Sequence, residues 1–181
     1  GPMPDVPAVP ARHPALRELE VHDLSYRYPG SDKGVANVGL RIARGQFVVI
    51  TGRIGSGKTT LLRALLGLLP ADAGTWQWNG EPVAEPAVFF TPPQAAYTPQ
   101  TPRLFSETLR DNILMGLHAD KPAGMQDATL AAALRQAVLE TDVPGLERGL
   151  ETLIGPRGVK LSGGQLQRAA AARMFVRLPE L

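Results

Sequence analysis

The sequence has no cysteine, and this absence excludes several kinds of site at once. Disulfide frameworks, thiolate metal sites and cysteine nucleophiles all need that side chain, and a reducing cytosol is compatible with its absence. Histidine is scarce too. Its three copies show no metal-ligand spacing, so the sequence argues against a zinc site. These copies are His13, His22 and His118.

The sequence also lacks a strong charge imbalance and a long apolar run. Its 19 basic and 17 acidic residues leave a net charge of +2. The basic residues form no run, which favours an ordinary solvated surface over nucleic-acid binding. The most apolar segment, Leu61–Leu69, contains Arg63 and is far too short to cross a bilayer.

The 181 residues correspond to one domain with a sizeable core. Gly1 and Pro2 before Met3 resemble a protease-cleavage scar, and no apolar stretch of a signal peptide follows. Five prolines fall within the first 14 residues, a density typical of an extended tail. We therefore expect residues 1–15 to lie outside the ordered domain.

Apolar periodicity predicts strands in the first half of the chain. Residues 19–28 alternate in the manner of a strand, with a break at His22-Asp23. Residues 47–50 form a continuous apolar run, typical of a strand buried on both faces in a parallel sheet. The other expected strands are Val35–Ile42, Thr75–Trp78 and Ala95–Thr98.

Helical periodicity dominates the second half of the chain. We expect helices at Lys58–Leu68, Thr108–Met115, Gln126–Glu140 and from Ser162 towards Arg177. The predicted organisation is therefore a β-rich portion at residues 16–104 and a helical portion at residues 105–181.

A glycine-rich loop follows the apolar run and fits the pattern G-x-x-x-x-G-K-[ST]. Glycines let the backbone curl so that successive N–H groups surround phosphate oxygens, and the helix that starts there adds its positive end. Lys58 would contact the β- and γ-phosphates, and the Thr59 hydroxyl would ligate Mg²⁺. The predicted nucleotide-binding residues are Gly52, Gly55, Ser56, Gly57, Lys58, Thr59 and Thr60.

A second glycine motif, Leu161-Ser162-Gly163-Gly164-Gln165, stands at the start of a predicted helix. One interpretation is an N-cap, in which Ser162 accepts from the first backbone N–H groups. The other is a second phosphate site, since two adjacent glycines cost helix stability and suggest close approach by a ligand. The chain would then have two phosphate-binding elements, of which only the loop at residues 52–60 is a P-loop. A symmetric dimer would explain both, because each nucleotide would touch the P-loop of one chain and the second motif of the other.

Together these motifs resemble the nucleotide-binding domain of an ABC transporter, over roughly residues 16–181. The loop at residues 52–60 is similar to the Walker A motif, and residues 161–165 match the LSGGQ signature letter for letter. Gln100 matches the Q-loop glutamine, which touches Mg²⁺ and the attacking water in that family. Tyr28 matches the aromatic residue that stacks on adenine, although Tyr26 is a rival two residues away.

The resemblance implies a fold and a set of partners. It implies an α/β P-loop NTPase core with an antiparallel β subdomain and an inserted helical subdomain, binding ATP and Mg²⁺. Ser162, Gly163, Gly164 and Gln165 would bind the nucleotide held by a second, head-to-tail copy. Transmembrane domains would be the other partners, with the chain itself soluble at the cytoplasmic face of the membrane and no nucleic acid involved.

Two stretches resemble exporter-type members of the family. The segment Pro102–Ile113 is similar to the one after their Q-loop, and Gly155–Gly158 is similar to their x-loop. Pro156 stands where that loop usually carries Glu, which weakens any inference about its contact with coupling helices. The start near Met3 resembles a domain made apart from its membrane part, although an excised piece would look the same.

The sequence does not contain the family's Walker B acids or switch histidine, since its last Asp is Asp142 and its last His is His118. The C-terminal part of the core is thus missing, and Lys58 and Gln100 are the catalytic residues that remain. We expect negligible ATP hydrolysis by this chain alone, because positioning and charge stabilisation carry phosphoryl transfer. We also expect an unpaired edge on the strand at residues 47–50, with poor stability or association as the result.

Alternative interpretations remain open. The chain could come from a soluble ABC ATPase without a membrane partner, or be a non-hydrolysing nucleotide-binding module. An engineered or proteolytic fragment is a third account of its length.

Overall fold

The structure is a computed structural model that describes residues 14–115, 117 and 123–181. The predicted tail therefore lies almost wholly outside the described residues. The described chain forms two compact units. Unit 1 consists of residues 14–94 with Glu180, and unit 2 of the described residues from 95 to 179 with Leu181. This division falls before the boundary at 104/105 that the sequence predicts.

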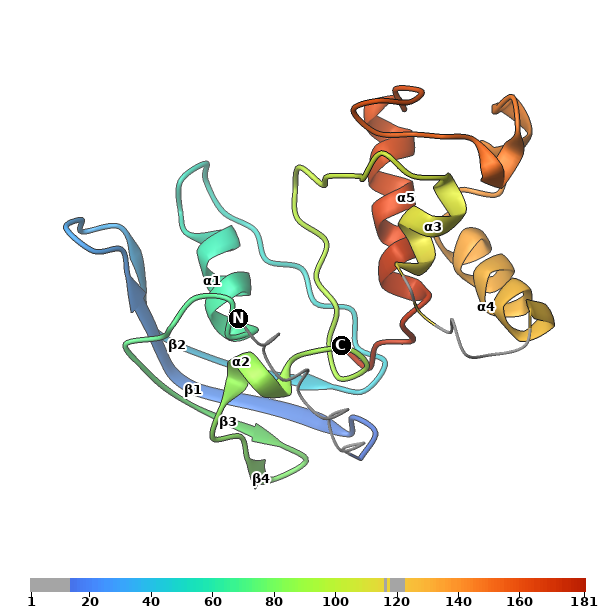
Figure 1. The fold of residues 1–181 in the computed structure, drawn as a ribbon. Helices are drawn as coiled ribbons and strands as arrows, with labels where there is room; N and C mark the ends of the chain where they lie inside the picture. The colour runs from blue at the N-terminus through green and yellow to red at the C-terminus, as the bar shows by residue number, and fades with distance from the viewer. Residues whose placement is uncertain (1–13, 116, 118–122) are drawn as a thin grey trace, which may run out of the picture. The chain divides into compact units, whose positions relative to one another are not determined.

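Unit 1 is built on a four-stranded antiparallel sheet (Figure 1). The strand order is β2-β1-β3-β4. These strands are β1 (Glu18–Arg27), β2 (Gly34–Ala43), β3 (Ala73–Trp78) and β4 (Glu81–Pro82). The sheet confirms the antiparallel β subdomain and three of the strands that periodicity predicts.

The alternation along β1 buries one side of the strand in the core of unit 1. Leu19, Val21 and Leu24 are fully buried, and Tyr26 is only 7% exposed. The alternation shifts phase between Val21 and Leu24 because the register with β2 shifts there, with Asp23 at a φ of 54°. The break in the apolar alternation at His22-Asp23 therefore corresponds to this irregularity in the strand pairing.

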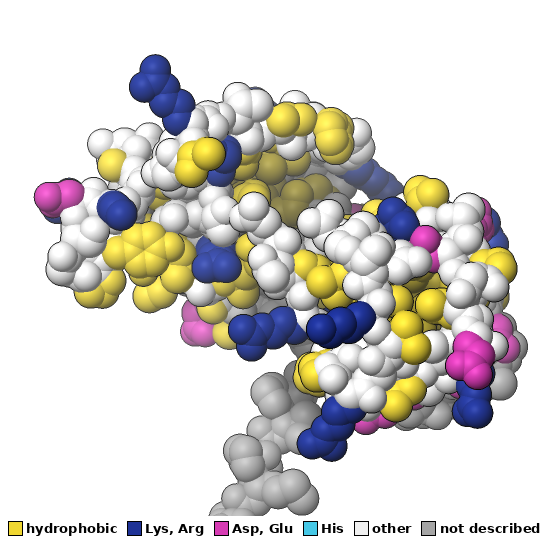
Figure 2. Space-filling model, turned by 90° about the horizontal axis from the view of Figure 1, so that it is seen from above, with side chains coloured by type: hydrophobic (Ala, Val, Ile, Leu, Met, Phe, Trp, Pro, Cys, Tyr) yellow, Lys and Arg dark blue, Asp and Glu magenta, His cyan; other side chains and the backbone are white. Residues whose placement is uncertain are grey.

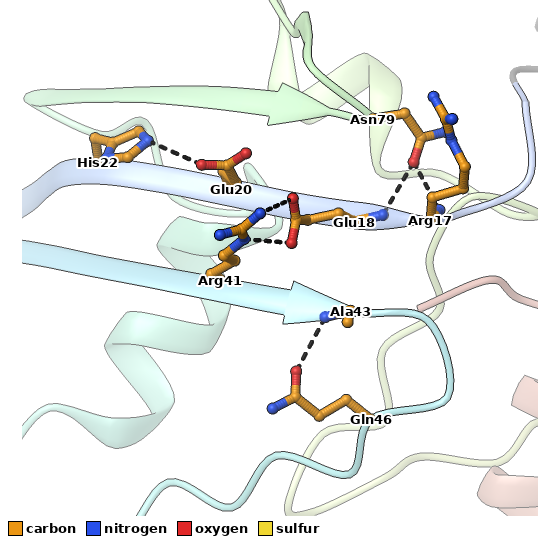
Figure 3. A network of polar contacts seen from close by, with 8 residues as sticks. All are labelled: Arg17, Glu18, Glu20, His22, Arg41, Ala43, Gln46 and Asn79. Carbon is orange, nitrogen blue, oxygen red and sulfur yellow. Dashed lines mark hydrogen bonds and ion pairs between the residues drawn. The ribbon is translucent and has the colours of Figure 1, made fainter.

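A network of polar contacts lies on the outer side of β1 (Figure 3). Arg41 of β2 donates through two nitrogens to the Glu18 carboxylate, and His22 lies 3.7 Å from Glu20. Asn79 Oδ1, at the turn after β3, accepts from the backbone N–H groups of Arg17 and Glu18 at 2.6 and 3.0 Å. These exposed contacts fix the strand ends more than they stabilise the fold.

Helix α1 (Lys58–Leu65) packs against β1 and β2 through its buried face, which includes Ala64 and Leu65. The Trp76 indole N–H of β3 donates to the Leu65 carbonyl at 3.0 Å. The helix ends before the predicted Leu68, because Gly67 adopts a φ of 67° where a side chain would collide with the backbone of α2 (Pro86–Phe89).

Unit 2 is helical, with α3 and α4 beside α5 (Figure 1). Its elements are α3 (Leu109–Leu114), α4 (Ala123–Gln136), the 3₁₀ turns η1 (Val143–Gly145) and η2 (Gly149–Glu151), and α5 (Gly163–Phe175). All three predicted helices of this half are therefore present, with shifted ends. Their buried faces form one core: Leu109, Ile113, Leu114, Leu130, Ala133, Leu134, Ala137, Leu139, Ile154, Ala169, Ala172 and Val176.

Asn112 is a polar residue buried in unit 2, with only 1% of its surface exposed. Its amide group donates to the carbonyls of Phe105, Glu107 and Thr108 at 3.0 to 3.3 Å, and its Oδ1 accepts from the Phe105 N–H at 2.7 Å. Arg173 of α5 adds a bond to the Asn112 carbonyl at 2.7 Å. Asn112 thereby ties the segment before α3 to the helices.

Two predicted strands are wrong. Residues 47–50 have no strand conformation, and Phe47 is 91% exposed, the reverse of a run buried on both faces. Residues 95–98 are not a strand either, although the Ala96 N–H donates to Leu181 O at 3.0 Å. A strand needs neighbours that accept and donate its backbone hydrogen bonds, and no described strand lies beside residues 47–50.

On the face drawn in Figure 2, hydrophobic side chains are interspersed with Lys and Arg. No helix in the described ranges is long and apolar enough to cross a membrane.

We predict that Asn112→Ala lowers the free energy of unfolding by about 2–3 kcal/mol, since it leaves several buried backbone groups without partners. Urea denaturation measures this effect. The matched control is Thr141→Ala, which removes one exposed hydroxyl bond to Val138 O and should change stability by less than about 0.5 kcal/mol. Equal effects of the two substitutions would contradict the central role of Asn112.

We predict that the exposed run at residues 47–50 drives self-association, because contact with a second copy would remove its apolar side chains from water. Val49→Lys, at a position 65% exposed, should reduce the associated fraction measured by light scattering after gel filtration. Val88→Lys is the matched control, since Val88 is 61% exposed in α2. A monodisperse wild-type monomer of high thermal stability would argue against this prediction.

Candidate functional site

The glycine-rich loop of unit 1 curls through three glycines with positive φ. These angles are 155° at Gly52, 83° at Gly55 and 89° at Gly57, a region that side chains rarely adopt. Space is limiting as well, since a Cβ on Gly57 would lie 2.9 Å from Val35 Cγ1 of β2. The sequence pattern therefore reflects a backbone that only glycine allows here.

The helix that follows this loop starts without a side-chain cap. Gly57 is the N-cap residue of α1 and has no side chain to accept a hydrogen bond from the first-turn N–H groups. The first turn also carries no acidic residue. Exposed N–H groups and the positive end of the helix dipole together make this position suited to an anion.

Lys58 folds back over its own loop. Its Nζ donates to Gly52 O at 2.9 Å and to Arg53 O at 2.8 Å. This ammonium group is therefore held over the curl of the backbone, where phosphate oxygens could replace the two carbonyls as acceptors. Ser56 and Thr59 are exposed on the same loop, so their hydroxyls are open to a ligand.

Tyr28 joins this loop through a contact that the sequence did not predict. Its hydroxyl lies 3.3 Å from Thr60 Oγ1, within hydrogen-bond distance, and Thr60 is buried in α1. Tyr28 is half-buried, whereas Tyr26 belongs to the sheet core and meets the Tyr28 ring edge-on at 5.0 Å. Between the two rivals, Tyr28 has the more accessible ring.

The second glycine motif starts α5 in unit 2, with Ser162 as its N-cap. The Ser162 side chain accepts from the Gln165 N–H at 3.3 Å, and Gln165 Oε1 accepts from the Ser162 N–H at 2.9 Å. This capping box realises the N-cap interpretation of the sequence. It uses no N–H of Gly163 or Gly164, so the cap and a phosphate site are compatible.

Gln100 and Gly164 line the same hollow in unit 2, with a volume of about 480 Å³. The residues around it are Thr98, Pro99, Gln100, Gly164, Gln167, Arg168 and Ala171. The structure therefore brings together two predicted site residues that are far apart in the sequence. The loop at residues 52–60 and Tyr28 belong to unit 1.

Asp142 contacts the second glycine motif, and sequence reasoning missed it. Its carboxylate accepts two bonds from Arg168, at 2.7 and 2.9 Å, and one from Gln165 Nε2 at 3.4 Å. The bonds from Arg168, and then from Gln165, hold the pKa of Asp142 below its usual value. No local pattern links these positions, because the contact depends on how the chain returns to α5.

A divalent cation would need help from a bound phosphate. In the part of the chain that the structure describes, no group of three His, Asp or Glu side chains could hold a metal. The exposed hydroxyl of Thr59 and the exposed amide of Gln100 are suitable oxygen donors, but they belong to different units. The oxygen of each side chain is of the kind that Mg²⁺ prefers, a cation that takes its other ligands from water and phosphate.

Comparisons with known proteins show the family to which the chain is related. A family model described as "ABC transporter" matches residues 35–181. The chain is 35% identical over 179 residues to the probable multidrug resistance ABC transporter ATP-binding/permease protein YheI of Bacillus subtilis, covering 97% of this chain and 29% of that protein. It is 36% identical over 160 residues to the ATP-dependent lipid A-core flippase of Aromatoleum aromaticum, covering 88% of this chain and 26% of the flippase.

A solved structure of a bacterial Atm1-family ABC exporter with ATP bound is also similar. The TM-score is 0.74 at 28% sequence identity, and the match covers 97% of this chain and 30% of that one. The chain thus spans less than a third of the length of each of these relatives.

We predict that the ring of Tyr28, and not its hydroxyl, contributes to ATP affinity. Tyr28→Ala should weaken the binding of Mg-ATP by about 1–3 kcal/mol, the usual contribution of an aromatic ring stacked on a base. Tyr28→Phe keeps the ring and loses the contact with Thr60, so its affinity should stay near that of the wild type. Isothermal titration calorimetry distinguishes these cases, and an equal loss in both variants would show that the hydroxyl is what matters.

Proposed function

Because the chain belongs to the ABC transporter family, we propose that it is the ATP-binding domain of an exporter and binds Mg-ATP through residues 52–60. The single observation that carries this proposal is the uncapped start of α1 beneath a loop of positive-φ glycines. A polyphosphate supplies the negative charge and the acceptors that this turn lacks. Lys58, held over the loop, would add a compact positive charge.

We further propose that residues 162–165 complete the nucleotide site of a second copy. The capping box leaves the first-turn N–H groups of Gly163 and Gly164 available at the N-terminus of α5. A head-to-tail arrangement would bring this motif to the phosphates held by the partner's loop. Gln100 lines the same hollow as Gly164, and we propose that its side chain contacts Mg²⁺ and the attacking water.

The names and lengths of the relatives support a membrane partner. The two similar proteins are an ATP-binding/permease protein and a flippase, and the chain covers 29% and 26% of them. We propose that transmembrane domains of an exporter use the ATP cycle of this domain, on the cytoplasmic side of the membrane.

Hydrolysis by the 181 residues alone should be negligible. The family is one of ATPases, but the sequence does not contain the family's Walker B acids, and Glu180 is the one acidic residue after the second glycine motif. Asp142 comes before the second glycine motif, and its carboxylate is occupied by Arg168 and Gln165. Without a general base, and without a carboxylate that binds Mg²⁺, the bound phosphates would lack the groups that stabilise the transition state.

We predict that Lys58→Ala weakens Mg-ATP binding by at least about tenfold, through loss of a charge-assisted contact to phosphate. Lys160→Ala is the matched control, because it removes an exposed lysine of unit 2 and should leave the affinity unchanged. Calorimetry gives the affinities, and a phosphate-release assay on the same samples should stay at background. Equal affinities for wild type and Lys58→Ala would contradict binding at this loop. A turnover rate near that of a full-length relative, abolished by Lys58→Ala, would contradict the proposed inactivity.

A further inference from the structure

We infer that Asp142 is a positioning residue for the glycine motif at residues 161–165, acting through Gln165 and Arg168. This inference rests on the proposed function, in which that motif binds the nucleotide of a second copy. Asp142 is the last aspartate of the sequence, and its carboxylate is held by two residues of α5. Its role therefore lies in the shape of the motif.

The chain between α4 and η1 fixes Asp142 in place. Leu139 is buried in the core of unit 2, and its N–H donates to Leu134 O at 2.9 Å. The Asp142 N–H then donates to Leu139 O at 3.0 Å. Asp142 is thus anchored to the core within one turn, which makes it a rigid support for the exposed start of α5.

Asp142 decides which way the Gln165 amide points. Gln165 Nε2 donates to Asp142 Oδ1 at 3.4 Å, so its Oε1 faces the Ser162 N–H and accepts from it at 2.9 Å. With the amide reversed, a nitrogen donor would face the Ser162 N–H, and the capping box would be lost. The carboxylate therefore selects the orientation that shapes the first turn.

Asp142 also holds Arg168 against the motif. The guanidinium donates Nε at 2.7 Å and Nη2 at 2.9 Å to the two carboxylate oxygens, a bidentate geometry. The remaining nitrogen, Nη1, lies beside Gly164, where a Cβ built on that glycine would be only 3.2 Å away. The Arg168 guanidinium is therefore held in place beside Gly164. The same Arg168 side chain lines the hollow that Gln100 also lines.

The role inferred for Asp142 differs from that of an ion pair that only stabilises the fold. An ordinary surface pair contributes little, and its loss should affect the whole unit weakly. Asp142 instead shapes one turn. Its removal should loosen the first turn of α5 and release the Arg168 side chain, while the buried core of unit 2 is untouched.

Hydrogen exchange measured by NMR on the 181-residue chain tests the inference. In Asp142→Asn, the amide of Gln165 should exchange about tenfold faster, because the bond from that N–H to Ser162 Oγ depends on the capping box. Asp142→Glu keeps the carboxylate and should restore most of the protection. Asp127→Asn is the matched control, since it breaks an Arg110 ion pair of the same 2.7 Å length elsewhere in unit 2.

Two results would overturn the inference. One is a Gln165 amide whose exchange is unchanged in Asp142→Asn. The other is an equal acceleration in Asp127→Asn, or throughout the core amides, which would mark a general loss of stability. Faster exchange confined to the start of α5, with rescue by Asp142→Glu, supports it.

A second measurement separates this inference from the proposed function. A Lys58→Ala chain cannot hold phosphates well, but it carries an intact glycine motif, so it should tighten the binding of fluorescent Mg-ATP to wild-type chains. Adding Asp142→Asn to the Lys58→Ala chain should reduce that gain severalfold, and Asp142→Glu should recover it. If Lys58→Ala chains give no gain at all, the head-to-tail site is wrong, while the exchange experiment still decides whether Asp142 shapes the turn.

Discussion

The first-turn N–H groups of each helix need partners, and this constraint organises the protein. Helix α3 meets it locally, because the Thr108 side chain accepts from the Asp111 N–H at 3.0 Å. Helix α5 meets it in part through the capping box of Ser162 and Gln165. Helix α1 begins at Gly57 with no side-chain cap, which leaves its N–H groups open to an anionic ligand. Each glycine motif thus stands at a helix start where some first-turn N–H groups lack a side-chain acceptor.

Each unit supports its motif with a different kind of contact. In unit 1 the loop lies against the sheet, since Gly57 approaches Val35 closely and Tyr28 reaches Thr60. In unit 2 polar anchors perform this task, with Asn112 inside the helical core and Asp142 at the surface end of α5. Sheet packing suits a loop that must curl around phosphates. Charged and amide groups suit a turn that presents backbone N–H groups to a second molecule.

Sequence reasoning succeeded where the signal is local. The alternation of β1, the periodicity of α4 and α5 and the loop at residues 52–60 all depend on neighbours along the chain. It failed at residues 47–50, where Phe47 and Val49 have strand composition but no described strand beside them. The composition of a segment indicates its propensity to form a strand. The strand itself forms only when neighbouring segments supply its backbone hydrogen bonds.

The same distinction applies to the site. The sequence by itself determined the family resemblance, the curled loop and the capped start of α5, because glycine, lysine and serine impose these features within a few residues. Only the tertiary structure decided that Tyr28 meets Thr60, that Gln100 shares a hollow with Gly164, and that Asp142 holds Gln165 and Arg168. Those pairs are many residues apart, and their geometry follows from how the core of each unit brings distant segments back together.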